Sequence, residues 1–152
     1  MRKSIFAVAI AVVLTVASFT ANAGIDKWTD DWAQGTTEYM YTNKQNMTVN
    51  FSCSPDRPMS IHLDNGNRST GNQTEARATI IFNNDKRTLV EVDYNDNSMA
   101  GLRAHEYVMQ SLASEKSVTV IIGKMSGTFP LTGSAEVFKD NDCAAGDEWV
   151  KG

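Results

Sequence analysis

The sequence is poor in cysteine, proline and histidine, with two, three and two of them among 152 residues. The cysteines form no CxxC pair, and His105-Glu106 lacks the second histidine of an HExxH zinc motif, because position 109 is Met109. Basic residues are outnumbered 14 to 18 by acidic ones, which gives a formal net charge of −4. These shortages argue against a zinc module, a zincin and the basic surface typical of nucleic-acid binding. We expect no metal and no cofactor.

Motifs for phosphate binding and for serine nucleophiles are missing as well. The chain contains no GxGxxG, no phosphate-binding loop and no GxSxG. Its length suits one ordinary domain and is too short for a barrel enzyme or a two-domain dinucleotide enzyme. The sequence therefore favours a single domain without enzymatic activity.

The N-terminus has the pattern of a secretory signal peptide. Two basic residues precede an apolar run at 5–19, and Ala21-Asn22-Ala23 supplies the small-x-small cleavage pattern. We predict a signal peptide over residues 1–23 and a periplasmic or secreted mature domain over 24–152, without stable membrane insertion. Cleavage removes two basic residues and no acidic one, so the mature domain carries 12 basic against 18 acidic residues, a net charge of −6.

The two cysteines are predicted to form one structural disulfide. Export places Cys53 and Cys143 in an oxidising compartment, and with two cysteines only one intramolecular pairing exists. The bond would close nearly the whole mature domain, and the chain-entropy model assigns such a loop about 4–5 kcal/mol as an upper figure.

Short alternating segments between turn residues predict a mainly β, α+β domain: an antiparallel sandwich or barrel-like sheet with one packed helix. Strands are expected at 36–42, 47–53, 59–63, 76–82, 88–94 and 117–122, the last one central because it is nearly all apolar. A helix is expected at 102–113, where Leu102, His105, Met109 and Leu112 form an apolar stripe, capped by Asn97 or Ser98. A shorter helix is expected around 135–138.

The tryptophans lie near the ends of the mature chain. Trp28 and Trp32 are four residues apart, a spacing that would place them together on one helical turn. Aromatic residues at chain ends most often pin those ends onto the core, and we expect this of Trp28, Trp32 and Trp149; an exposed binding patch is the alternative.

Two polar loops are the candidate binding surface, provided that they lie at the same end of the domain. Residues 64–75 contain no apolar residue and are rich in turn formers, and 93–98 is a second polar turn. The candidate residues are Asp64, Asn65, Asn67, Arg68 and Asn72 in the first loop and Asp93, Asn95, Asp96 and Asn97 in the second. The second loop resembles the start of a calcium loop but lacks its glycine and its bidentate glutamate, so an Asx turn is the simpler interpretation.

The order of features resembles small exported bacterial proteins of the invasion-associated locus B type and the periplasmic accessory proteins of type VI secretion. The residues that carry the likeness are a Trp near the mature start, a strand ending in cysteine at Met47–Cys53, and the Phe-x-Leu-x-Gly segment at Phe129–Phe138 that leads to Cys143. The resemblance implies a β-rich sandwich or barrel with a binding or accessory role and no catalysis.

The sequence thus predicts a periplasmic binding or accessory protein whose partner is another protein, with a basic one favoured by the acidic charge. One alternative is an inhibitor of a basic enzyme such as lysozyme. A second is a small cell-wall hydrolase, which would require His62 or His105 to meet a carboxylate in a cleft. Because His105 lies in the same apolar stripe as Leu102 and Met109, it is more typical of a packed core histidine.

Reduction of the exported protein should lower its melting temperature by several degrees, because the unfolded chain gains the entropy that the disulfide removes. Thermal unfolding with and without a reductant measures this. An unchanged melting temperature would contradict a structural Cys53–Cys143 bond.

Overall fold

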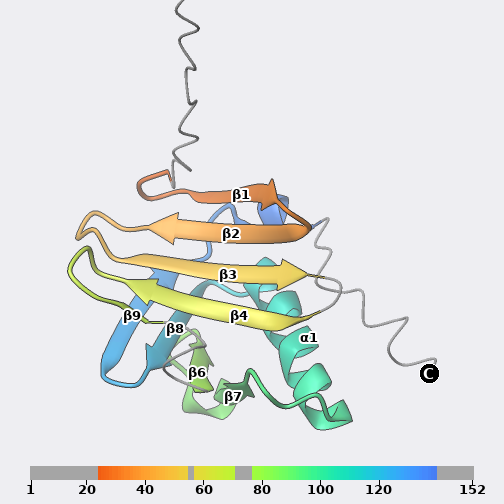
Figure 1. Ribbon diagram of the computed structural model, residues 1–152. Helices are drawn as coiled ribbons and strands as arrows, with labels where there is room; N and C mark the ends of the chain where they lie inside the picture. Colours follow the sequence, from red (N-terminus) through yellow and green to blue (C-terminus); the bar gives the residue numbers. More distant parts are fainter. Residues whose placement is uncertain (1–23, 55–56, 71–76, 140–152) are drawn as a thin grey trace, which may run out of the picture.

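Two antiparallel sheets and one long helix make up the part of the chain that the computed structural model describes, residues 24–54, 57–70 and 77–139 (Figure 1). The strands are β1 (Trp28–Ala33), β2 (Thr36–Thr42), β3 (Thr48–Ser54), β4 (Arg57–Asp64), β5 (Ser69–Thr70), β6 (Arg77–Phe82), β7 (Val90–Asp93), β8 (Ser117–Ile122) and β9 (Met125–Pro130). The helices are α1 (Met99–Ser114), α2 (Ser134–Phe138) and the 3-10 turn η1 (Lys86–Thr88). The predicted mainly β domain with one principal helix is confirmed.

The first sheet is a meander with the order β1-β2-β3-β4-β5, in which every strand pairs with its neighbour in the chain. Gln34 and Gly35 join β1 to β2 with φ values of 54° and 78°, the left-handed conformation that tight two-residue hairpin turns require at both positions. The strands predicted at 36–42, 47–53 and 59–63 therefore lie side by side. Part of the loop predicted at 64–75 adds the short strand β5 to the same sheet.

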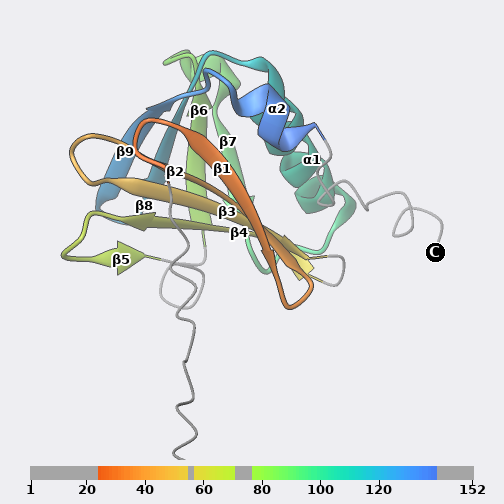
Figure 2. The ribbon, with the colours of Figure 1, turned by 90° about the horizontal axis from the view of Figure 1, so that it is seen from above.

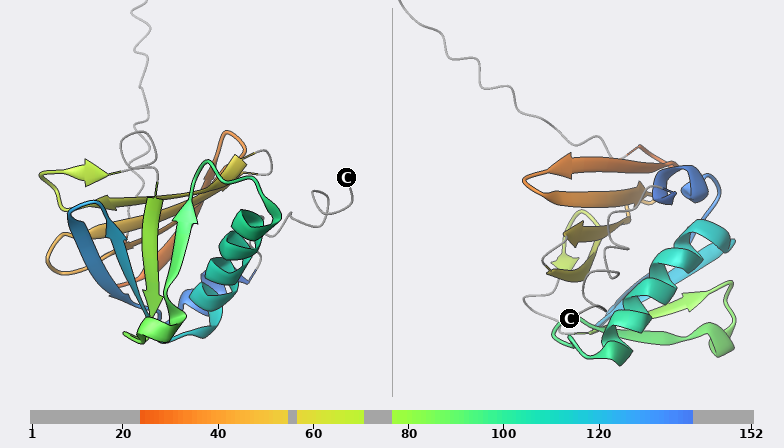
Figure 3. Two further views of the ribbon diagram at one scale, coloured as in Figure 1. Left: turned by 90° about the horizontal axis from the view of Figure 1, so that it is seen from below. Right: turned by 90° about the vertical axis from the view of Figure 1, so that its right-hand side faces the viewer.

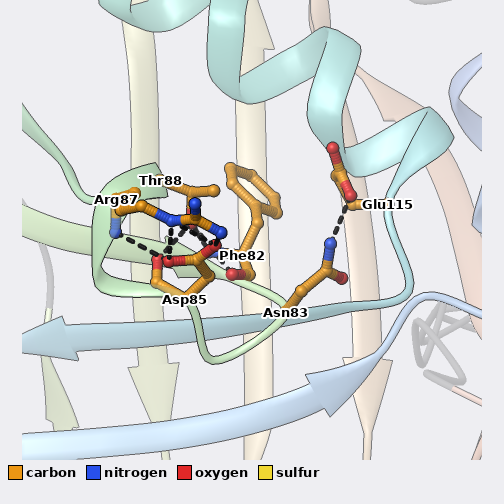
Figure 4. A network of polar contacts seen from close by, with 6 residues as sticks. All are labelled: Phe82, Asn83, Asp85, Arg87, Thr88 and Glu115. Carbon is orange, nitrogen blue, oxygen red and sulfur yellow. Dashed lines mark hydrogen bonds and ion pairs between the residues drawn. The ribbon is translucent and has the colours of Figure 1, made fainter.

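The second sheet has the order β7-β6-β8-β9, so that β8 is an interior strand, as its apolar sequence predicts. The predicted hairpin is β6 with β7, and its turn places Asn83 and Asn84 at φ values of 53° and 54°. Figure 4 shows how side chains fix this turn: the Thr88 hydroxyl accepts the Phe82 N–H at 2.9 Å, and the Asn83 amide donates to the Glu115 carboxylate. These side-chain hydrogen bonds stabilise the turn between β6 and β7.

One hydrophobic core lies between the two sheets. Strand β3 shows the pattern, since its alternate residues Val49, Phe51 and Cys53 are buried. The opposing sheet contributes residues such as Ile80 and Val120, and Figure 3 shows α1 lying along one side of the molecule between the sheets. Tyr94, just after β7, donates its hydroxyl to the Ile61 carbonyl of β4 at 3.2 Å, which links the two sheets directly.

The long helix begins earlier than predicted, at Met99, and its stripe faces the core. Ser98 is the N-cap, and its hydroxyl accepts the Gly101 N–H at 3.2 Å. Met109 and Leu112 are buried, and α1 packs against α2, β7 and β4. Gly101 allows the turn before the helix to approach it closely, because a Cβ there would lie 2.3 Å from the Asp96 carbonyl oxygen.

The predicted helical turn at Trp28 and Trp32 is wrong, because these residues belong to strand β1. A spacing of four residues suits a helix, but it also places two side chains on one face of a strand, so the spacing alone could not decide. Trp28 is 2% exposed and pins the chain as predicted, with its indole Nε1 donating to the Pro130 carbonyl at 2.8 Å. Trp32 is 66% exposed, so the prediction that it also pins the chain onto the core is wrong. Trp149 lies outside the described residues.

Cys53 is 3% exposed at the end of β3, on the inner face of the first sheet. Cys143 lies outside the described residues, so no disulfide falls within them and the Cys53–Cys143 pairing stays a prediction. The predicted signal peptide at 1–23 lies outside them as well. None of the helices in the described part has the length and apolar character needed to span a membrane.

The two tryptophans of β1 form a matched pair for testing the core. Trp28→Phe should destabilise the domain by about 1–3 kcal/mol, since it removes a buried hydrogen bond and leaves a cavity. Trp32→Phe should change stability by less than about 0.5 kcal/mol. Urea unfolding of both variants measures this, and equal losses would contradict the role given to Trp28.

Candidate functional site

The outer face of the five-stranded sheet is polar and lies opposite the core. Cross-strand pairing aligns its side chains in three rows. The rows are Thr29–Met40–Asn50–His62, Asp31–Glu38–Ser52–Ser60 and Thr42–Thr48–Asp64–Ser69. Figure 1 looks onto this face, and no described helix or strand lies across it. We call these three rows the outer face.

A depression of about 310 Å³ lies in the outer face. Its lining consists of Glu38, Met40, Thr48, Asn50, Ser52, His62, Asp64 and Ser69. Met40 is the apolar member, and although it points away from the core it is only 9% exposed. The hydroxyls of Thr42 and Thr48 lie 2.8 Å apart and bond across the strands. The depression thus has a packed sheet behind it and hydrogen-bonding groups around it.

The charges on the outer face have one sign. Asp31, Glu38 and Asp64 are the carboxylates of its three rows, and none of the residues in these rows is a lysine or an arginine. The nearby cations belong to turns: Lys44 lies 3.3 Å from the Asp26 carboxylate, and Arg68 is in the β4–β5 turn. The three rows therefore present an acidic surface.

The first predicted loop lies at the rim of the depression. Asp64 ends β4 and lines the depression, while its carboxylate accepts the Gly66 N–H at 2.6 Å. The Asn65 side chain accepts the N–H groups of Asn67 and Arg68 at 3.1 and 2.8 Å. These are Asx-type bonds that order the turn. Asn72 lies outside the described residues.

The second predicted loop lies elsewhere. The Asp93 carboxylate accepts the Asn95 N–H at 2.9 Å and also pairs with Arg77 at 3.1 Å. The Asp96 carboxylate accepts the Ser98 N–H at 2.9 Å, and the hydrogen bonds from Ser98 lower the pKa of this carboxyl. These bonds form the turn into α1, in agreement with an Asx turn. Asn97 is exposed in the same turn.

The two loops do not share an end of the domain. Figures 1 and 2 place the β4–β5 turn and the β7–α1 turn on opposite sides of the molecule. Residues 93–97 and residues 64–68 therefore do not form one surface, and only the first loop lies beside the outer face.

The two histidines are also separated. His62 points outward from β4 and lines the depression, whereas His105 is on the core side of α1 and is 8% exposed. Burial lowers the pKa of His105, with a smaller opposing effect from the Asp96 charge, and its Nε2 has no hydrogen-bond partner among the described residues. His105 is thus the core histidine that its helical stripe predicts.

The described part of the chain contains no metal cluster. No group of three or more His, Cys, Asp or Glu side chains there is placed to hold a metal ion. His62 makes no hydrogen bond there to a carboxylate or a hydroxyl, and activation of a nucleophile depends on such a bond. The arrangement is suited to binding a polar or charged group on a rigid surface.

A family model matches residues 26–138, from just before β1 to the end of α2. The chain belongs to the YfjT family. The matched region contains both sheets and every residue that lines the depression, so the YfjT-family unit is the whole described domain. No curated protein and no solved structure matches this YfjT-family chain. The resemblance to invasion-associated and type VI accessory proteins stays a prediction.

Sequence reasoning placed Asp64 in the site but did not single out Glu38, Asn50 or His62 for binding. The alternation in 47–53 marks Asn50 and Ser52 as outward-facing, and this signal was available. Which outward residues become neighbours depends on strand order and register, which no single segment carries.

The buried His105 makes a testable contribution to acid sensitivity. Its pKa in the folded state lies below the ordinary value of 6.5, so the unfolded chain binds more protons as the pH falls through 6.5, and stability is lost there. His105→Leu removes this proton and the unpaired nitrogen. The fall in melting temperature between about pH 7.5 and pH 5 should be smaller in the variant than in the parent; equal falls would contradict this role.

Proposed function

We propose that this protein is an exported, periplasmic, non-enzymatic binding or accessory protein that engages a partner protein through the outer face. The observation that carries the proposal is the depression of about 310 Å³ on a face that no described element covers. Its polar lining comes from four adjacent strands and sits on a packed core. Rigid support of this kind favours binding, because little side-chain and backbone order has to be gained on association.

The export step of this proposal rests on the N-terminal signal pattern and on the predicted disulfide. The reach of the chain supports that pairing. Phe138 stacks on Tyr39 at 4.4 Å between ring centroids, and Tyr39 is two residues from Thr37, the cross-strand partner of Cys53. The segment from Phe138 to Cys143 can span about 17 Å when extended, so Cys143 can reach Cys53.

A second candidate is inhibition of a basic enzyme such as lysozyme, and the acidic outer face favours it. Carboxylates on one face would steer a basic enzyme toward that face. Lysozyme activity measured with and without a micromolar excess of the protein separates the two candidates, because a general binding protein would leave the rate unchanged.

A hydrolase remains the least favoured function. His62 does line the depression, as do Glu38 and Asp64. It is not hydrogen-bonded to a hydroxyl nucleophile or to a carboxylate among the described residues, and the other histidine is in the core. The lining is better matched to recognition than to proton transfer.

Filling the depression should abolish partner binding without unfolding the sheet. Asn50→Trp places a large side chain at its centre, and aromatic residues are well tolerated in strands. Thr79→Trp is the matched control, since Thr79 is also a half-buried polar residue that points outward from an interior strand, in the other sheet.

The exported full chain and both variants are compared by cross-linking in periplasmic extract. The proposal expects one cross-linked partner with the parent and with Thr79→Trp, and its loss with Asn50→Trp at unchanged circular dichroism. Absence of any partner with the parent, or equal capture by all three proteins, would contradict it.

A further inference from the structure

The turn between β4 and β5 contains the only Asn-Gly pair of the sequence, Asn65-Gly66. In such a pair the backbone nitrogen of the glycine can attack the side-chain amide of the asparagine, because glycine has no Cβ to hinder the approach. The turn lies at an edge of the molecule (Figure 2), with Gly66 exposed and Asn65 half-buried. Water therefore has access to the pair.

Glycine is the residue that suits position 66. Its φ is 80°, in the left-handed region, and a Cβ there would lie 2.6 Å from the side-chain nitrogen of Asn46 in the neighbouring β2–β3 turn. The conformation of the turn and its contact with Asn46 thus require the residue that leaves the attacking nitrogen least hindered.

The Asp64 carboxylate is placed to take up the proton that the attacking nitrogen loses. Its Oδ1 accepts the Gly66 N–H, with 2.6 Å between the oxygen and the nitrogen. A general base has to lie within this distance of the group that it deprotonates. Asp64 is therefore positioned as the proton acceptor for an attack by the Gly66 nitrogen.

Two backbone N–H groups are directed at the oxygen of the Asn65 side chain. The Asn67 and Arg68 nitrogens lie 3.1 and 2.8 Å from Asn65 Oδ1. Attack on the Asn65 Cγ moves negative charge onto this oxygen, and paired N–H groups stabilise such charge in acyl transfer. They also hold the side chain in place, so less rotational freedom is lost on the way to the transition state.

The turn before α1 contains a similar arrangement that lacks two of these features. The Asp96 carboxylate accepts the Ser98 N–H at 2.9 Å, across Asn97, as Asp64 does across Asn65. Within the described residues, however, the Asn97 side chain accepts no N–H group. The following residue is Ser98, which has a Cβ and is the N-cap of α1. Asn97 is therefore an internal comparison for Asn65.

We propose that the β4–β5 turn modifies itself at Asn65. The Gly66 nitrogen bonds to the Asn65 Cγ, and its proton passes through Asp64 to the side-chain nitrogen. The Cγ–Nδ2 bond then breaks, ammonia leaves, and a succinimide ring remains. Water opens the ring at either carbonyl and gives aspartate or isoaspartate at position 65. The reaction does not depend on partner binding by the outer face.

The modification changes the rim of the depression. Either product adds one negative charge beside Asp64, which lines the depression. Isoaspartate also adds a methylene group to the main chain, which displaces the oxygen from the Asn67 and Arg68 N–H groups. The rim of an aged molecule therefore differs in charge and in backbone path from that of a newly made one.

Conversion is measured on the full exported chain, incubated in neutral buffer, by peptide mapping with mass spectrometry that separates aspartate from isoaspartate. Asn65 should convert at least about tenfold faster than Asn97. It should also convert about tenfold faster in the folded protein than in the urea-unfolded chain, because unfolding separates the proton acceptor and the N–H donors from the reacting atoms. An unmodified Asn65, or faster conversion in the unfolded chain, would overturn the proposal.

Asp64→Asn tests the proton acceptor, since it keeps an oxygen for the Gly66 N–H and removes the basic carboxylate. Conversion of Asn65 should slow by about tenfold at unchanged circular dichroism. Asp93→Asn is the matched control, because Asp93 likewise accepts the N–H two residues ahead, at 2.9 Å, and it should leave the rate at Asn65 unchanged. Equal rates in the parent and Asp64→Asn, or a faster rate in Asp64→Asn, would show that Asp64 does not promote the reaction.

Discussion

Burial of the Trp28 indole is the interaction on which the rest of the structure depends. Its ring contacts Tyr41 and Phe51 of the first sheet and Phe138 of α2, with centroids 5.4 to 6.2 Å apart. Its N–H donates to the Pro130 carbonyl at the end of β9. One side chain thereby joins the first described strand to the last described strand and to the helix that follows it, about a hundred residues further along the chain. Because the strand that holds it also holds Asp31, the packing of Trp28 positions the edge of the outer face.

Local features of the fold were predictable from sequence, and features that depend on pairing were not. Alternating apolar residues predict the β6–β7 hairpin, and the apolar stripe around Met109 and Leu112 predicts α1. Strand β1 was missed because two tryptophans four residues apart fit either period. The short strand β5 was missed because Ser69 and Thr70 have turn-forming character, and only pairing with β4 makes them extended.

The candidate site shows the same division. Asp64 was identified from a polar run in one segment, whereas the depression also takes Glu38 and Asn50 from two other strands. Their proximity follows from register, since Met40, Asn50 and His62 are aligned across three strands. A single residue slip would turn the polar set inward and the apolar set outward, so the buried face of the sheet determines the register of the outer face. The hydrophobic core and the binding surface are therefore specified by the same alternation.

The turn at the rim of the depression has a consequence for how fast a partner can associate. Asp64 and Asn65 already bond to the N–H groups that follow them, so the backbone from Asp64 to Arg68 is ordered before any contact is made. Docking on this rim requires little loop rearrangement, which is the step that slows many association reactions. For a partner that docks on this rim, ordering of the turn from Asp64 to Arg68 would therefore not be a separate step of association.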